Sequence, residues 1–145
     1  MAVETVDDVW IDAPVERVFA FMDEPANQAA VTPSLAVAER VERLDNGGNR
    51  ARYVYRLFGI SFEGEVRASR YEPPERIVYD LVGDLTGTIT LTFAAEDGGT
   101  RLTYAASYGI PGPVPEWLLA PLVGWYNARE VRRLLATVRD RLATE

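Results

Sequence analysis

The chain contains no cysteine, no histidine and no lysine. Without cysteine there can be no disulfide bond and no thiolate chemistry. Without histidine or cysteine, the usual zinc, copper and haem sites are not expected, and Ser-His-Asp or Cys-His catalytic groups cannot form. Any proton transfer would have to use Asp, Glu, Tyr or Arg. We therefore expect neither a metal ion nor a cofactor.

Long apolar runs are also missing. No run of about 18 apolar residues is present, so the sequence predicts no transmembrane helix and no stable membrane insertion. The opening residues 1–5 show no basic region followed by an apolar one, so no signal peptide is expected and a cytoplasmic location is the default.

Positive charge is scarce as well. The formal net charge is −7 and every one of the 15 basic residues is arginine. Nucleic-acid binding depends on basic side chains that neutralise phosphates, so the sequence argues against a nucleic-acid partner. With 145 residues, 48% of them hydrophobic, the chain is long enough to bury a core as one domain over 1–145.

Turn-forming residues divide most of the chain into short extended segments. They predict a first strand over 3–11 and six more over 35–45, 50–58, 61–72, 75–83, 86–96 and 99–110. Two short helices are expected between the first two strands, the first capped by Asp12 and ended by Pro25. Strands and helices segregated in this way are typical of an α+β fold with an antiparallel sheet.

Three turns provide a test of register. A turn at Gly59-Ile60 would place Tyr55 opposite Gly64. A turn at Pro73-Pro74 would place Ala68 opposite Tyr79, and one at Asp97-Gly98 would place Leu91 opposite Tyr104. All three turns sort apolar residues to one face of the sheet, which favours an antiparallel meander.

A long amphipathic helix is predicted over 115–142. Its buried stripe has two halves: Val131, Leu135, Val138 and Leu142 are bulky, whereas Ala120, Gly124 and Ala128 are small. Small residues either let another backbone approach or leave a space beside the helix.

Three segments resemble one known family. They are Val9–Phe21 with its Ile-Asp-Ala-Pro and Val-Phe-Ala-Phe pieces, Tyr71–Ile77 with its Pro-Pro turn, and Gly98–Tyr104 at the start of a strand. Together they are similar to the START-like, or SRPBCC, superfamily, which includes polyketide cyclase/dehydrase-like proteins and the birch-pollen-allergen type. The resemblance implies a helix-grip fold, in which a seven-stranded curved sheet wraps around the C-terminal helix and leaves an apolar cavity. Members range from lipid carriers to cyclases, so the resemblance indicates a class of ligand and not a reaction.

The inward face of the predicted sheet is rich in tyrosine. Two interpretations remain open: the rings fill the core with their hydroxyls at its rim, or they line a small-molecule pocket. The second gives these candidate ligand-binding residues: Tyr53, Tyr55, Phe62, Tyr79, Ile89, Leu91, Tyr104, Tyr108, Trp117, Ala120, Gly124 and Ala128.

Two charged residues share the inward parity, Glu39 and Arg70. A buried charge needs a partner, so either side chain would orient a polar ligand group, and Glu39 would serve as a base. The alternative is that the strands bulge and both side chains reach solvent.

The sequence favours binding or carriage of a hydrophobic or aromatic small molecule or lipid between the sheet and the C-terminal helix. One alternative is a polyketide cyclase/dehydratase-like enzyme that uses Glu39, Arg70 and tyrosine hydroxyls. Another is a protein-interaction module that uses the Leu118–Tyr126 surface, including a homodimer through the N-terminal half of the C-terminal helix. If Pro121 breaks that helix, the same surface instead turns inward as a lid.

Overall fold

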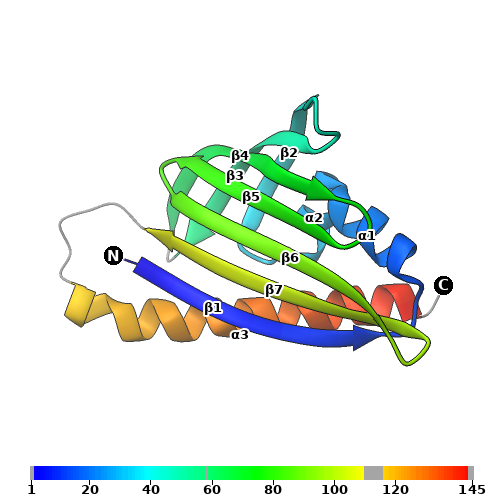
Figure 1. The fold of residues 1–145 in the computed structure, drawn as a ribbon. Coiled ribbons are helices and arrows are strands. Elements are labelled where there is room, and N and C mark those ends of the chain that lie inside the picture. Colours follow the sequence, from blue (N-terminus) through cyan, green and yellow to red (C-terminus); the bar gives the residue numbers. More distant parts are fainter. Residues whose placement is uncertain (1, 58, 110–115, 144–145) are drawn as a thin grey trace.

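The computed structural model describes residues 2–57, 59–109 and 116–143, and the side chains of the last helix from Gly124 onward. Seven strands form one antiparallel sheet in the order β1-β7-β6-β5-β4-β3-β2 (Figure 1). The elements along the chain are β1 (Ala2–Ile11), α1 (Val15–Asp23), α2 (Pro25–Val31), β2 (Leu35–Arg43), β3 (Asn49–Leu57), β4 (Ile60–Glu72), β5 (Arg76–Gly83), β6 (Thr86–Glu96), β7 (Gly99–Gly109) and α3 (Glu116–Ala143).

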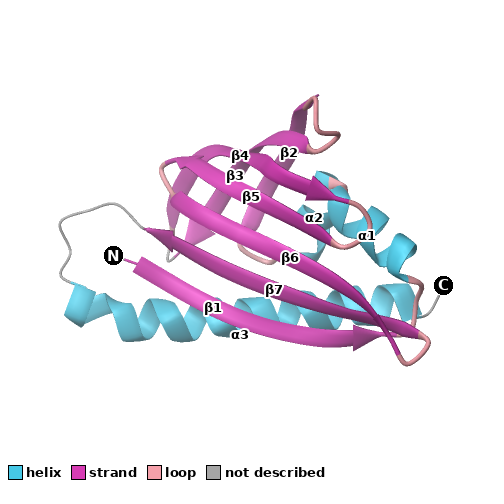
Figure 2. Ribbon diagram, viewed as in Figure 1, coloured by secondary structure: helices cyan, strands magenta, loops and turns pink. Residues whose placement is uncertain are grey.

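The sheet curves around α3, which lies along the edge strand β1 (Figures 1 and 2). The short helix α1 contacts β6 and β7, and α2 contacts β2 and α3. The two short helices and α3 therefore leave one face of the curved sheet uncovered. This architecture confirms the helix-grip fold that the sequence predicts.

Two of the three predicted hairpin registers are confirmed. Ala68 pairs with Tyr79 across the Pro73-Pro74 turn, and Leu91 pairs with Tyr104 across the turn at Asp97-Gly98. Asp97 and Gly98 have φ values of 49° and 79°, the positive values that a type I′ hairpin turn requires.

The register predicted between β3 and β4 is wrong by two residues. Tyr55 pairs with Phe62, and not with Gly64, because Leu57 is the last residue of β3 and pairs with Ile60. Side chains alternate between faces with a period of two, so this shift leaves every inward-pointing residue on the inward face.

The start of α1 also differs from the prediction. Pro14, in an extended conformation, is the N-cap residue, and no side chain caps the helix, so Asp12 does not have the expected role. Pro25 opens α2 after α1 has ended at Asp23, and a first-turn proline costs no hydrogen bond.

The core lies where the C-terminal half of α3 packs against the sheet. The bulky half of the predicted stripe, Val131, Leu135, Val138 and Leu142, is buried, together with Leu134. Next to the α1 end of this core, Phe19 packs at 5.0 Å from Phe93 and 5.6 Å from Tyr71, measured between ring centroids.

Gly124, in the small half of the stripe, has open space beside it. A Cβ atom built there meets no atom of the described residues within 4 Å. Gly124→Ala is expected to raise the free energy of unfolding by about 0.5–1 kcal/mol, because alanine loses less backbone entropy in a helix. Urea denaturation measures the change. Gly64→Ala is the contrasting variant, because its Cβ would overlap the carbonyl oxygen of Val82. A Gly124→Ala variant that loses stability would show that this space is filled.

Candidate functional site

A cavity lies between the inward face of the sheet and α3. Its volume is about 110 Å³, counted as the space that the centre of a water molecule can occupy, and it therefore has room for several waters or a small apolar body. Most of the lining is apolar or aromatic, with a few amide and carboxyl groups. The described residues that line it are Pro25, Gln28, Thr32, Leu35, Ala38, Asn49, Ala51, Arg52, Tyr53, Tyr55, Val66, Tyr79, Leu81, Leu85, Ile89, Tyr104, Tyr108, Asn127, Glu130, Val131 and Leu134.

The structure brings part of the sequence-predicted site together around this cavity. The predicted residues in its lining are Tyr53, Tyr55, Tyr79, Ile89, Tyr104 and Tyr108. Phe62 and Leu91 are buried in the core beside it, outside the lining. Gly124 and Ala128 are partly exposed and are not among the described lining residues. The side chains of Trp117 and Ala120 lie outside the described residues.

One end of the cavity carries a buried carboxyl group from α3. Glu130 is 5% exposed. The Tyr55 hydroxyl donates to Glu130 Oε2 at 2.8 Å, and the backbone N–H of Ser34 donates to Glu130 Oε1 at 2.7 Å. The Ser34 hydroxyl also lies 2.7 Å from the Tyr126 hydroxyl. These bonds tie the start of β2 and the end of β3 to α3.

A buried amide lies one helical turn before Glu130. Asn127 is 6% exposed, and its Oδ1 accepts a hydrogen bond of 2.9 Å from the Tyr108 hydroxyl. Its Nδ2 is buried and has no acceptor among the residues that the structure describes. Because buried polar groups are nearly always paired, this free donor beside a cavity is a feature that a ligand would satisfy.

Neither α3 residue was predicted. The stripe predicted from the sequence runs through Gly124, Ala128 and Val131 and places Glu130 on another face of the helix. Glu130 lies three residues after Asn127 and four before the buried Leu134, and spacings of three and four place residues on one helix face. This alternative stripe was the signal that could have found both residues.

Burial keeps the cavity tyrosines neutral. Desolvation raises the pKa of Tyr55, Tyr79, Tyr104 and Tyr108 well above the ordinary value of 10.0. Each hydroxyl therefore keeps its proton well above neutral pH, and those of Tyr55 and Tyr108 donate hydrogen bonds to Glu130 and Asn127. The Tyr104 hydroxyl has no hydrogen-bond partner among the described residues, and its ring lines the cavity.

The two charged candidates, Glu39 and Arg70, point away from the cavity. The Glu39 side chain is 64% exposed and pairs with Arg52, and that of Arg70 is 60% exposed and pairs with Glu72. The cause is irregular pairing: β2 shifts register twice, and β4 shifts between Ala68 and Arg70. A bulge adds one residue and reverses the alternation beyond it.

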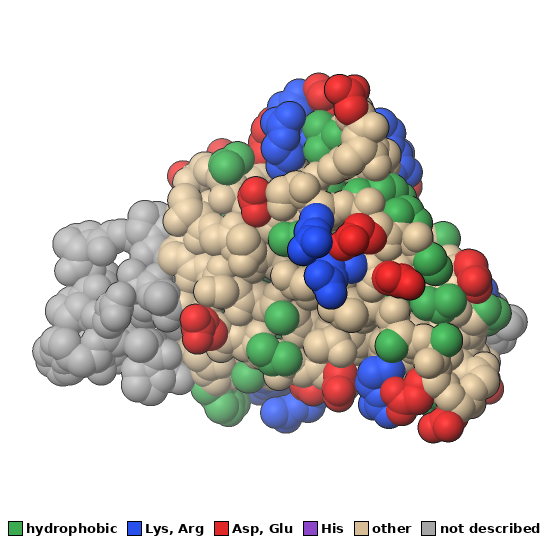
Figure 3. All heavy atoms as spheres, in the orientation of Figure 1, with side chains coloured by type: hydrophobic (Ala, Val, Ile, Leu, Met, Phe, Trp, Pro, Cys, Tyr) green, Lys and Arg blue, Asp and Glu red, His purple; other side chains and the backbone are tan. Residues whose placement is uncertain are grey.

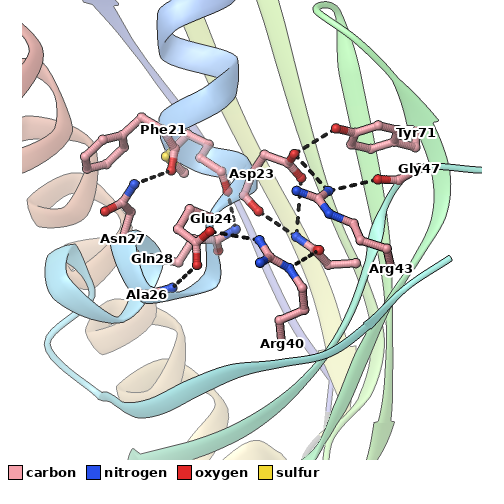
Figure 4. Close-up of polar contacts among 12 residues, drawn as sticks. Phe21, Asp23, Glu24, Ala26, Asn27, Gln28, Arg40, Arg43, Gly47 and Tyr71 are labelled. Atoms are coloured by element: carbon pink, nitrogen blue, oxygen red, sulfur yellow. Dashed lines mark hydrogen bonds and ion pairs between the residues drawn. The ribbon is translucent and has the colours of Figure 1, made fainter.

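A second polar cluster joins the α1–α2 corner to the sheet (Figure 4). The Tyr71 hydroxyl donates to Asp23 Oδ2 at 2.7 Å, and Arg43 lies 3.2 Å from the same oxygen. Asn49 Nδ2 donates to the Asp23 carbonyl oxygen at 2.6 Å, and Arg40 Nε donates to Asn49 Oδ1 at 2.7 Å. Since Asn49 also lines the cavity, this cluster fixes part of the cavity wall.

Charge on the visible outer face is mixed. Acidic and basic side chains are interspersed there with apolar ones and form no block of one sign (Figure 3). None of the helices in the described part of the chain combines the length and apolar character that a membrane crossing requires. Within the predicted interaction surface, Trp125 is exposed and lies 5.5 Å from the Arg129 guanidinium, whereas Leu118 lies outside the described side chains.

The fold is similar to those of several solved structures. TTHA0849 from Thermus thermophilus matches with a TM-score of 0.86 and 23% identity, over 97% of both chains. A START superfamily protein from Mycobacterium smegmatis matches with a TM-score of 0.79 and 15% identity, also over 97% of both chains. The di-domain ARO/CYC protein BexL of the BE-7585A biosynthetic pathway matches with a TM-score of 0.72 and 20% identity, over 97% of this chain and 50% of BexL.

At these identities the likeness shows the fold alone. No curated protein sequence matches the chain significantly. A family model does match, over residues 2–143, and its description is polyketide cyclase / dehydrase and lipid transport. The match spans nearly the whole chain, so the chain belongs to the polyketide cyclase / dehydrase and lipid transport family.

Proposed function

We propose that this protein binds and carries a hydrophobic or aromatic small molecule or lipid in the cavity between the sheet and α3. The observation that carries the proposal is the cavity itself, with its apolar lining and the free Asn127 Nδ2 donor at one end. Small-molecule sites commonly have this form, with apolar walls and a few polar groups that fix orientation. The family and the fold agree with a ligand of this class.

Carriage is favoured over catalysis because the predicted acid–base pair is absent from the cavity. Glu39 and Arg70 are solvent-exposed and paired with neighbours. The carboxyl group that does reach the cavity, Glu130, has both oxygens engaged by Tyr55 and Ser34. These bonds stabilise the helix–sheet contact. The other charged residue among the described lining residues, Arg52, is exposed and paired with Glu39, so it does not complete an acid–base pair with Glu130.

A substitution that fills the cavity tests the proposal. Ala38 lies on the edge strand β2, is partly exposed and lines the cavity. In Ala38→Trp the indole can extend into the cavity from its edge without displacing the closed core. We expect the variant to bind 2-isopropylnaphthalene at least about tenfold more weakly than the wild type, since tenfold corresponds to about 1.4 kcal/mol of lost apolar contact.

Isothermal titration calorimetry measures the affinities. Ala36→Trp is the matched control, because Ala36 is exposed on the same strand and does not line the cavity. It should bind the probe as the wild type does. Equal affinities for both variants and the wild type would place any binding outside the cavity and contradict the proposal.

A further inference from the structure

The polar end of the cavity constrains which ligands fit it. Four side chains meet there: Tyr55 from β3, Tyr108 from β7, and Asn127 and Glu130 from α3. Two hydrogen bonds connect them in pairs, Tyr55 to Glu130 at 2.8 Å and Tyr108 to Asn127 at 2.9 Å. The ligand atom at this end must therefore pair with the hydrogen-bonding groups that these two bonds leave free.

Some hydrogen-bond donors at this end have no acceptor among the residues that the structure describes. A tyrosine hydroxyl has one hydrogen to donate, and both hydroxyls here have already donated theirs. An Asn amide nitrogen carries two N–H groups, and neither of those on Asn127 Nδ2 finds an acceptor among the described residues. The free donors near this end are thus the Asn127 amide and the Tyr104 hydroxyl, which lines the cavity beside Tyr108 and Glu130 without a partner among the described residues, and both call for an oxygen acceptor on the ligand.

The same end disfavours a negatively charged ligand. Glu130 is buried and both of its oxygens act as acceptors, as an ionised carboxylate's do. A ligand carboxylate bound to Asn127 would bring a second negative charge into the buried site, where water screens little of the repulsion. The neighbouring tyrosines add no positive charge.

A cation also touches the cavity lining, and it does not change this conclusion. Arg52 lines the cavity, but its side chain is 45% exposed and pairs with Glu39 at 3.2 Å. An exposed, paired guanidinium contributes little attraction because water and its partner screen it.

We infer that the ligand is a neutral, mainly apolar or aromatic molecule that presents a ketone-type or phenolic oxygen to Asn127 Nδ2, and that the site rejects the corresponding carboxylate. The inference rests on the proposed cavity-binding function and adds the polar group of the ligand. It distinguishes a neutral carbonyl or phenol compound from a free fatty or aromatic acid, both of which have an apolar body.

Three probes with the same number of non-hydrogen atoms test it on the wild-type protein at neutral pH. They are 2-acetylnaphthalene, which has the acceptor; 2-isopropylnaphthalene, which has none; and 2-naphthoate, which has the negative charge. The ketone is expected to bind about five- to tenfold more tightly than the isopropyl compound, the usual gain from one satisfied buried hydrogen bond. The naphthoate is expected to bind at least about tenfold more weakly than the ketone.

Two variants assign the preference to its residues. Asn127→Leu combined with Tyr108→Phe removes the amide donor without freeing the Tyr108 hydroxyl, and it should reduce the preference for the ketone over the isopropyl compound while it still binds the latter. Glu130→Gln keeps an acceptor for Tyr55 and removes the charge, so it should narrow the gap between ketone and naphthoate. Asp140→Asn is the matched control, because it removes one charge from an exposed position of the same helix. It should leave all three affinities unchanged.

The outcomes separate this inference from the function on which it rests. Equal wild-type affinity for the ketone and the isopropyl compound would overturn the Asn127 inference while the carrier function stands. Naphthoate bound as tightly as the ketone would overturn the exclusion of carboxylates. Failure of all three probes to bind would reject the carrier function and the inference together. The affinities of the three probes for the wild-type protein test the inference even if the variant that combines Asn127→Leu with Tyr108→Phe does not fold.

Discussion

The free energy of unfolding is expected to fall steeply once the pH rises above about 10, because the cavity tyrosines must stay neutral in the folded chain. Burial raises the pKa of Tyr55, Tyr79, Tyr104 and Tyr108 above the ordinary value of 10.0. Below pH 10 both states hold these protons, so their contribution to stability does not change. Above pH 10 the unfolded chain loses the protons and the folded chain keeps them.

The size of the effect follows from proton linkage. Each tyrosine that ionises only in the unfolded state lowers the free energy of unfolding by about 1.4 kcal/mol per pH unit, and four together by about 5 kcal/mol per pH unit. The chain is well suited to this measurement, since it has no lysine and no cysteine to titrate in the same range. Its arginines stay charged throughout.

Urea denaturation at a series of pH values measures the loss, and the near-ultraviolet absorbance of phenolate reports ionisation. Tyr104→Phe should reduce the slope by about one proton, or about 1.4 kcal/mol per pH unit. It should cost little stability at neutral pH, because the Tyr104 hydroxyl has no hydrogen-bond partner among the described residues. If the phenolate absorbance near pH 10 is smaller by one tyrosine in Tyr104→Phe than in the wild type while both chains stay folded, the Tyr104 ring is not buried and the account is contradicted.

Leu135→Ala is expected to lower the free energy of unfolding by about 2–5 kcal/mol, the range for a large-to-small change in a packed core. Leu135 is among the largest fully buried side chains, and it packs from α3 into the core between this helix and the sheet. Removing its branched end leaves a space that the rigid sheet and helix cannot close. Urea denaturation at neutral pH measures the change.

Leu134→Ala is the matched control. Leu134 is as deeply buried as Leu135, but it lines the cavity, so part of its surface already borders open space. Fewer packing contacts are lost there, and its cost should fall at the lower end of the same range. Equal costs for the two variants would mean that the cavity is no more open beside Leu134 than the core is beside Leu135.

Much of the fold could be predicted because its signals are local. The turn residues at Pro73-Pro74 and Asp97-Gly98 mark two hairpins, and the bulky stripe Val131–Leu142 fixes the buried face of α3. At Pro73-Pro74 the predicted Ala68–Tyr79 pairing holds because the bulge between Ala68 and Arg70 offsets the extra residue of a turn that pairs Glu72 with Arg76. The β3–β4 register could not be fixed, because Gly59 suits either of two turn positions. This two-residue shift left the predicted inward-facing residues unchanged, because side chains alternate between the faces of a strand with a period of two.

The candidate site was harder to predict because its polar residues depend on tertiary contacts. The tyrosines were found by strand alternation, whereas Glu39 and Arg70 were misplaced by bulges that the sequence does not mark. Glu130 was overlooked because charged residues are rarely fully buried. Its burial depends on donors from Tyr55 and Ser34, which are distant in the sequence.

The most direct test of the binding site is a crystal structure of the protein grown with 2-acetylnaphthalene. We predict the naphthyl ring between the sheet and α3, among Tyr79, Tyr104 and Tyr108, with the ketone oxygen within hydrogen-bond distance of Asn127 Nδ2. A naphthyl ring bound outside this space, or a cavity filled by the protein's own side chains, would contradict the account.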